Sequence, residues 1–136
     1  MKKASVRDVM STSPVTLDPD ANVYEAANTI LVNRISGAPV VDTDGKLVGV
    51  VSELDILNAI VTSVYNGADP GIARVSEIMT AEVESNAPDD DVVSVAREML
   101  DNKRRRRPIV EDGVMKGQLT CRQILRAVTD MVDDAQ

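Results

Sequence analysis

Residues 38–55, with the sequence APVVDTDGKLVGVVSELD, decide the fold of this chain because they occur twice. The second copy, residues 107–123, has the sequence RPIVEDGVMKGQLTCRQ and is one residue shorter. In both copies an apolar run after a proline leads to an Asp-Gly pair, which is typical of a hairpin turn. A second apolar run follows and ends at a serine or threonine, a residue type that caps helices. Each copy therefore predicts two strands joined by a hairpin, followed by a helix.

The repeat extends on the amino-terminal side of both copies. Val9-Met10 recurs 69 positions later as Ile78-Met79. A stripe of apolar residues with the i, i+3, i+4, i+7, i+8 spacing of an amphipathic helix recurs at the same shift. The stripe consists of Val23, Ala26, Ala27, Ile30 and Leu31 in the first copy, and of Val92, Val95, Ala96, Met99 and Leu100 in the second.

These elements define one unit that occurs twice, with the order strand, helix, strand, strand, helix (βαββα). We predict an α+β fold with a first repeat over residues 1–66 and a second over residues 75–136. Residues 67–74, which include Gly67, Pro70 and Gly71, form the predicted linker, because glycine and proline interrupt regular structure.

The composition argues against an enzyme. The 136 residues include no histidine and one cysteine. A Ser-His or Cys-His nucleophile pair, a His-ligated metal and an intrachain disulfide are therefore excluded. We expect no catalytic residues, no metal ligands and no catalytic cofactor.

The charge distribution limits the partners. Lys and Arg number 15 and Asp and Glu number 22, a net charge of −7, which disfavours general nucleic-acid binding. Charges at Arg7 and Asp8 come too early for the apolar segment of a signal peptide. The longest apolar-rich uncharged stretch, residues 56–68, is too short to span a bilayer. We expect a cytoplasmic protein that does not contact membranes.

The order of the elements, the strand Pro39-Val40-Val41 and residues 49–55 (GVVSELD) resemble the cystathionine-β-synthase (CBS) domain family. The resemblance covers residues 5–130 and suggests a stand-alone tandem pair of CBS domains. It implies that the two repeats pack about a pseudo-twofold axis with clefts between them. The family binds adenosine-containing ligands in such clefts, and its pairs commonly form homodimers through their helices.

The resemblance places a ribose beside Asp55 in the first repeat, because one carboxylate can accept hydrogen bonds from both ribose hydroxyls. It places Ser52 near the ribose or the α-phosphate, and Thr16 on a strand edge that lines the pocket. A second interpretation needs no ligand: Ser52 and Asp55 also have the spacing of a helix capping box. Both interpretations remain open from the sequence.

The same resemblance places the adenine between apolar walls. One wall is Val50, and the other is the stretch Ile35-Ser36-Gly37-Ala38. The small residues Gly37 and Ala38 leave room for a flat ring, but they also suit close packing of a strand. These two interpretations are equally compatible with the sequence.

The second repeat departs from the family pattern. Thr120 and Gln123 stand where the first repeat has Ser52 and Asp55, so the carboxylate is lost. An amide can accept a hydrogen bond but lacks the negative charge that favours a diol. We also align Glu84 with Thr16, where a carboxylate would repel phosphates. The sequence predicts one competent site per chain, anchored by the first repeat.

The basic run Lys103-Arg104-Arg105-Arg106-Arg107 precedes the strand proline of the second repeat. The resemblance implies that Arg105 and Arg106 face the phosphates of a ligand held by Asp55, and arginine suits phosphate because its planar fork donates in pairs. Two other interpretations remain: a solvated basic loop, and contact of Arg104–Arg107 with nucleic acid. The missing aromatic stacking residues weigh against nucleic acid.

Together these observations predict a regulatory module that senses an adenine nucleotide and signals to an unknown protein partner. Phosphorylated ligands (AMP, ADP or ATP) are favoured, and S-adenosylmethionine is the alternative ligand. The alternative function is a structural or dimerisation module with empty clefts. A homodimer is expected in either case.

Overall fold

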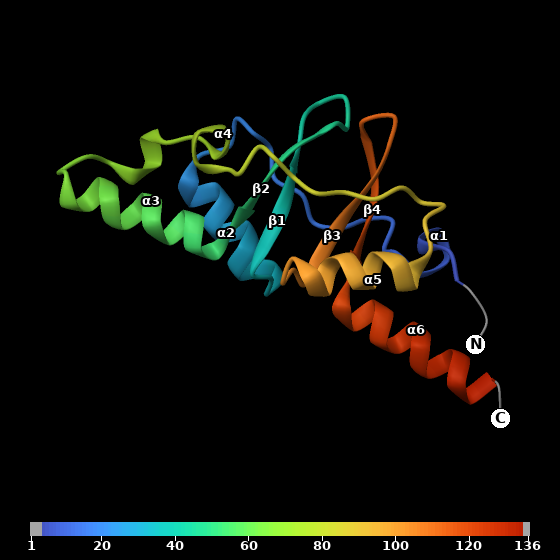
Figure 1. Ribbon diagram of the computed structural model, residues 1–136. Coiled ribbons are helices and arrows are strands. Elements are labelled where there is room, and N and C mark those ends of the chain that lie inside the picture. The colour runs from blue at the N-terminus through green and yellow to red at the C-terminus, as the bar shows by residue number, and fades with distance from the viewer. Residues whose placement is uncertain (1–3, 135–136) are drawn as a thin grey trace. The chain divides into compact units, whose positions relative to one another are not determined.

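The computed structural model describes residues 4–134, with side chains for residues 4–130. Residues 1–3 and 135–136, at the outer ends of the predicted repeats, lie outside the described residues. The elements in chain order (Figure 1) are α1 Val6–Val9, α2 Val23–Asn33, β1 Gly37–Val41, β2 Leu47–Ser52, α3 Glu53–Tyr65, the 3-10 turn η1 Pro70–Ile72, α4 Val75–Ile78, α5 Val92–Asp101, β3 Arg106–Glu111, β4 Val114–Thr120 and α6 Cys121–Asp134.

The chain divides into two compact units. The continuous unit comprises residues 15–83, and the discontinuous unit combines the residues up to 14 with those from 84 onward. The two units do not coincide with the repeats along the sequence, because the first helix of each repeat packs in the unit built around the other repeat's hairpin.

In the continuous unit, β1 and β2 form an antiparallel pair in which Gly37 lies opposite Ser52. The first strand expected for this repeat is reduced to one residue, Leu17, which bridges to Val40 in parallel. Helices α2 and α3 pack against each other, and α3 and α4 both contact β2 (Figure 1). The buried side chains that form the core are Leu17, Val23, Ala26, Ile30, Ala38, Val40, Val51, Ile56 and Val75.

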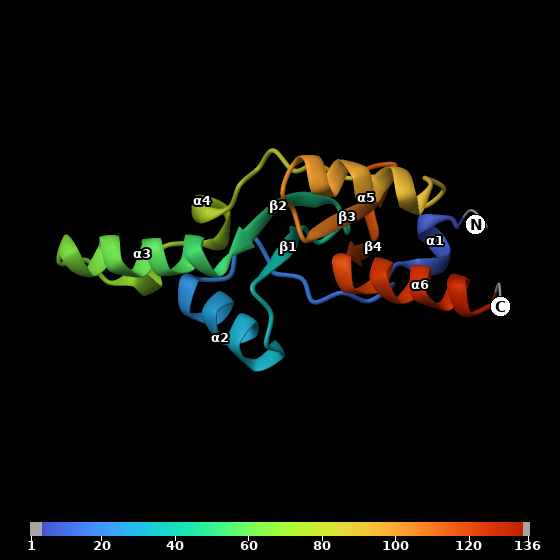
Figure 2. The same cartoon turned by 60° about the horizontal axis from the view of Figure 1, so that its bottom comes forward.

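The discontinuous unit repeats this plan. β3 and β4 pair antiparallel with Arg106 opposite Thr120, and Asn86 bridges to Ile109 in parallel. Helix α6 contacts β4, α5 and α1 (Figure 2). The core consists of Val6, Val92, Val95, Met99, Ile109 and Leu119.

The short first helices are held by backbone hydrogen bonds within their units. The amide of Val6 donates to the carbonyl of Asp90 at 2.9 Å, and that of Val75 donates to the carbonyl of Ala21 at 2.8 Å. Both valine side chains are fully buried. One apolar residue from each exchanged helix therefore completes the core of its unit.

The expected hairpin turns are confirmed, and polar side chains cap the amphipathic helices. The hairpin glycines Gly45 and Gly113 have φ of 81° and 80°, conformations that side-chain-bearing residues rarely adopt. Asn22 caps α2 by accepting from the amide of Glu25 at 2.9 Å, and Asp91 caps α5 by accepting from the amide of Ser94 at 3.0 Å. Across the described residues, no helix has the length and apolar character needed to cross a membrane.

Candidate functional site

Some of the residues predicted to bind ligand meet at one end of the β1–β2 pair. Because the strands are antiparallel, the start of β1 at Gly37 lies beside the end of β2 at Ser52. The carbonyl of Ser36 accepts a hydrogen bond from the amide of Glu53 at 2.8 Å, which joins the residues before β1 to the start of α3. These residues, 15 and 17 positions apart in sequence, thereby form one corner.

Ser52 and Asp55 form a reciprocal capping box at the start of α3. The amide of Asp55 donates to Ser52 Oγ at 3.1 Å, and the amide of Ser52 donates to Asp55 Oδ2 at 2.8 Å. Both side chains are half-buried. Within the described part of the chain, Asp55 Oδ1 accepts no hydrogen bond, so one oxygen of the carboxylate is left for another partner.

Val50 lies further along the strand pair, opposite Pro39, and Thr16 precedes the residue that bridges to Val40. Leu17, which follows the exposed Thr16, is tied to β1 by hydrogen bonds with Pro39 and Val41. Val50 is half-buried, and its backbone exchanges hydrogen bonds of 3.0 and 2.9 Å with Thr80. The contact with Thr80 was not predicted from the sequence, because nothing local marks residue 80 as a strand partner of residue 50.

The stretch before Pro39 is close-packed. Ile35 is half-buried, Ser36 is exposed, and both Gly37 and Ala38 are buried. A Cβ atom on Gly37 would lie 2.8 Å from the carbonyl oxygen of Val51, so this position requires glycine for strand packing alone. The packing interpretation therefore holds for Gly37, and a contact with adenine remains a prediction.

The second repeat keeps the cap and loses the carboxylate. The amide of Thr120 donates to Gln123 Oε1 at 2.9 Å, and the amide of Gln123 donates to Thr120 Oγ1 at 3.2 Å. This geometry matches the one made by Ser52 and Asp55. Capping alone therefore does not require a negative charge at position 55.

The alignment of Glu84 with Thr16 is wrong by one residue. Leu17 bridges to Val40, and Asn86 bridges to Ile109, the counterpart of Val40. Asn86 therefore takes the place of Leu17, and Ser85 that of Thr16. The similarity of Val15-Thr16 to Val83-Glu84 was misleading, because the extended segments lack internal periodicity to fix their register.

Glu84 has a structural partner in the same unit. Its Oε2 accepts from the guanidinium of Arg107 at 3.2 Å and from the side-chain amide of Asn102 at 2.8 Å. Arg107 also donates to Asn86 Oδ1 at 2.7 Å and to Glu98 Oε2 at 3.4 Å. The carboxylate that we expected to repel a phosphate is therefore paired with Arg107.

The basic run does not act as one solvated loop. Arg107 is only 3% exposed, whereas Arg104 and Arg105 are exposed and Arg106 is half-buried. The interpretation as a solvated loop is wrong for Arg107, and contact with nucleic acid cannot use this side chain. Arg105 precedes β3 and Arg106 is its first residue, so neither belongs to the unit that contains Asp55.

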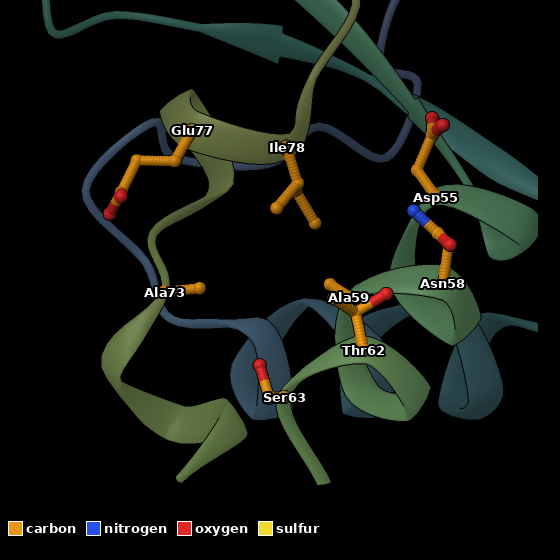
Figure 3. A pocket seen from close by; sticks show the side chains of 8 residues that line it. All are labelled: Asp55, Asn58, Ala59, Thr62, Ser63, Ala73, Glu77 and Ile78. Atoms are coloured by element: carbon orange, nitrogen blue, oxygen red, sulfur yellow. The ribbon is translucent and has the colours of Figure 1, made fainter. Parts of the chain in front are cut away.

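A hollow of about 420 Å³ lies between α3 and the segment around α4 (Figure 3). Asp55 stands at its rim with the carboxylate directed away from it. The other lining residues are Asn58, Ala59, Thr62, Ser63, Ala73, Glu77 and Ile78. Sequence reasoning missed this set, although Asn58 and Thr62 follow Asp55 by three and seven residues and so share its helix face.

Among the described residues, no group of three or more histidine, cysteine, aspartate or glutamate side chains could hold a metal ion.

Comparison with known proteins identifies the repeated unit. The model of the CBS domain family matches residues 6–62 and 75–130. An inosine-5'-monophosphate dehydrogenase from Aquifex aeolicus is 35% identical over 119 residues, which cover 86% of this chain and 23% of the enzyme. The uncharacterized protein MJ1225 of Methanocaldococcus jannaschii is 27% identical over 121 residues, which cover 89% of this chain and 41% of that protein. The chain spans less than half the length of these two relatives.

Solved structures share the fold over nearly the whole chain. The structure of CBSX2 in complex with AMP matches with a TM-score of 0.82 and 27% identity, covering 93% of this chain and 97% of that one. The CBS domain pair of protein MJ0100, in complex with 5'-methylthioadenosine and S-adenosyl-L-methionine, matches with a TM-score of 0.78 and 29% identity, covering 96% and 99%. The predicted α+β fold with two tandem repeats is confirmed. The chain belongs to the CBS domain family and carries two copies of the domain.

Proposed function

We propose that this chain is a regulatory module that binds one adenosine-containing ligand at the corner formed by the first repeat. The ligand is an adenine nucleotide (AMP, ADP or ATP) in preference to S-adenosylmethionine. Binding shifts the conformation or association of the module, and a partner protein receives the signal. The similar structures that hold AMP, or 5'-methylthioadenosine with S-adenosyl-L-methionine, support this ligand class.

The observation that carries the proposal is the carboxylate of Asp55. Gln123 completes the same capping box in the second repeat, so the cap does not explain the charge at position 55. The cap uses Oδ2, and Oδ1 is left to accept from a ribose hydroxyl. Charge-assisted hydrogen bonds of this kind are about twice as strong as neutral ones.

Residues from the rest of the corner complete the proposed site. Ser52 contributes its hydroxyl near the ribose or α-phosphate, and Val50 forms an apolar wall for the base. Thr16 and the stretch 35–38 line the remaining sides. Arg105 and Arg106, which lie outside this corner, are the residues that the resemblance assigns to phosphate, and arginine favours phosphorylated ligands over a cationic sulfonium ligand.

Isothermal titration calorimetry with AMP, ADP, ATP and S-adenosylmethionine tests the proposal. Asp55→Gln is the informative variant, because glutamine preserves the cap as Gln123 does and so separates ligand binding from helix stability. Glu53→Gln is the matched control, since it removes an exposed carboxylate two residues away. We expect wild type and E53Q to bind about one nucleotide per chain, and D55Q to bind about 100-fold more weakly. Equal binding by D55Q and wild type would contradict the proposal.

A second candidate function, a dimerisation module, is favoured by the surface of α3. Leu54, Leu57, Val61 and Val64 are 72%, 57%, 57% and 65% exposed on this helix. An apolar stripe of this length is typical of an association surface. Sedimentation of wild type and of the double variant Leu57→Lys/Val61→Lys tests it, with a dimer expected only for wild type. Dimerisation together with an absence of heat for every ligand would favour this candidate over the sensor.

A further inference from the structure

A group of exposed cations lies where the end of α5 meets the start of α6 (Figures 1 and 2). Two belong to the turn after α5 and two to the first two turns of α6, and together we call them the basic patch: Lys103, Arg104, Arg122 and Arg126. The turn is held against the helix start by Cys121. Its thiol donates to the carbonyl of Arg104 at 3.8 Å, and its amide donates to the carbonyl of Arg105 at 3.0 Å.

The basic patch has no counter-ion within its own unit. Among the described residues, none of its four side chains forms an ion pair or a side-chain hydrogen bond. Asp101 and Asp130, the carboxylates nearest to it in sequence, bond to none of them. Arg122 and Arg126 are four residues apart on α6, a spacing at which like charges repel each other. The patch therefore does not stabilise the fold.

The first repeat has one cation at the equivalent positions. Arg34 is the counterpart of Lys103, since each follows its helix in the left-handed conformation, with φ of 55° and 54°. The other three counterparts are uncharged: Ile35, Leu54 and Asn58. The same fold is thus built without the three arginines, so their presence in the second repeat needs an explanation outside the fold.

Exposed leucines lie beside the basic patch. Leu100 near the end of α5 is 70% exposed, and Leu125 on α6 is 69% exposed. Leu125 follows Arg122 by three residues and precedes Arg126, so it shares their part of the helix surface. The surface therefore offers cations together with apolar side chains, a combination of arginine and apolar groups that is common in protein–protein interfaces.

These properties fit a protein segment that is both acidic and apolar. Its carboxylates would pair with the arginines, and its apolar side chains would cover the two leucines. A nucleic acid would meet the cations but leave the leucines uncovered, and the chain has no Phe or Trp on which bases could stack. A second copy that used the same face in a symmetric contact would place four cations against four.

We propose that the basic patch, with Leu100 and Leu125, docks an acidic amphipathic segment of the partner protein. The inference rests on the proposed function for the existence of such a partner. Docking itself requires no bound nucleotide, because every residue of the surface lies outside the corner of Ser52 and Asp55.

Fluorescence anisotropy with a labelled peptide of about 15 residues, made of glutamate and leucine at helical spacing, tests the proposal. Wild type should bind the peptide, and added salt should weaken the binding. Arg122→Glu/Arg126→Glu should bind at least about tenfold more weakly. Lys46→Glu/Lys116→Glu is the matched control, because it makes the same change in net charge at exposed lysines of the two hairpins. It should bind within about twofold of wild type.

Two further variants separate the contributions of charge and apolar contact. Arg122→Gln/Arg126→Gln removes the charge, keeps good helix formers and should also lose affinity. Leu125→Ser should weaken binding of the leucine-containing peptide and leave unchanged the binding of a peptide in which serine replaces leucine. Circular dichroism and melting curves check that each variant is folded.

Several outcomes would overturn the inference. Equal binding by wild type and both arginine variants would place the peptide elsewhere. Equally tight binding of single-stranded DNA or of anionic vesicles would show a general polyanion surface. A dimer in sedimentation that dissociates in R122E/R126E but persists in K46E/K116E would make a second copy the occupant.

The experiment also distinguishes this inference from the proposed nucleotide site. Peptide binding without binding of any nucleotide would reject the proposed ligand and leave the docking surface standing. Nucleotide binding without peptide binding would reject the docking surface and leave the proposed ligand standing.

Discussion

The two repeats place different side chains at the start of the strand that follows each amphipathic helix: apolar ones in the first repeat, and polar and charged ones in the second. In the first repeat, Leu17 and Ala38 are 4% and 2% exposed and belong to the core; this pair is called the apolar corner below. In the second, Asn86 and Arg107 take their places and bond to each other and to Glu98; this pair is called the ionic corner. The backbone around both corners is the same, with equivalent bridges and strand registers. The same backbone therefore accommodates either an apolar or an ionic corner, provided that every buried polar group has a hydrogen-bond partner.

A second difference between the repeats concerns charge at the helix cap. Asp55 and Gln123 make the same capping box. The repeat with the apolar corner keeps the carboxylate, and the repeat with the ionic corner lacks it. The comparison shows that the repeats differ in side-chain chemistry at equivalent positions while retaining one fold, and the following substitutions test what this difference does.

The largest effect is expected from placing an arginine at position 38 of the first repeat without the partners that Arg107 has in the second. Ala38→Arg would bury a guanidinium in the first repeat, where Leu17 and the neighbouring core offer no carboxylate. An uncompensated buried charge costs about 3–5 kcal/mol, and urea unfolding should show this loss. Thr43→Arg, in the exposed hairpin turn, is the control and should change stability little. A variant A38R as stable as wild type would mean that the apolar corner can admit charge.

The next largest effect is expected from giving the first repeat the cap of the second. Asp55→Gln should weaken nucleotide binding about 100-fold, or about 2.7 kcal/mol, because the charge-assisted hydrogen bond from a ribose hydroxyl to Oδ1 is lost. The melting temperature should change little, since glutamine preserves the cap. Calorimetry and thermal unfolding on the same sample separate the two quantities. A large fall in melting temperature would show that the charge itself stabilises α3.

A smaller effect is expected from converting the ionic corner into the apolar one. Arg107→Ala alone should lower the free energy of unfolding by about 2 kcal/mol, because Asn86 loses a charged partner. Asn86→Leu/Arg107→Ala recreates the pair Leu17/Ala38 and should recover most of this loss, since well-packed apolar groups can replace a buried ion pair. Urea unfolding of both variants measures the difference. Failure of the double variant to recover would mean that the corners are not interchangeable.

The smallest effects are expected at the two caps. Ser52→Ala and Thr120→Ala each remove a hydroxyl that accepts from a helix amide. Each should cost about 1 kcal/mol, the usual value of such a cap. Equal losses in thermal unfolding would support the equivalence of the caps. A loss confined to one repeat would show that the two helices depend on their caps to different extents.

Much of the fold could be predicted because its signals are local. The hairpin turns at Gly45 and Gly113 and the caps at Ser52 and Thr120 all involve residues within four positions of one another. The apolar stripe of α2 likewise follows from helical spacing. The corner of Ser52 and Asp55 was predictable for the same reason, and its role in binding remains a prediction.

Features that depend on distant contacts were not predictable in the same way. Glu84 was aligned with Thr16 one residue out of register because the sequence of a short extended segment does not show which residues it pairs with. The first helices α1 and α4 follow the repeat in sequence, but their valines complete the cores of the opposite units. The burial of Arg107 was also missed, because a run of arginines in sequence resembles a solvated segment.

The sequence by itself determined the repeat, the order of helices and strands, the hairpins and the caps, since each depends on backbone preferences and side-chain spacing over a few residues. Only the tertiary structure decided which corner is apolar and which is ionic, which helix completes which core, and that one arginine of the run is buried. The physical reason is that the burial of a charge depends on partners that the chain supplies from afar: Glu84 lies 23 residues from Arg107 in sequence and 3.2 Å from its guanidinium in space.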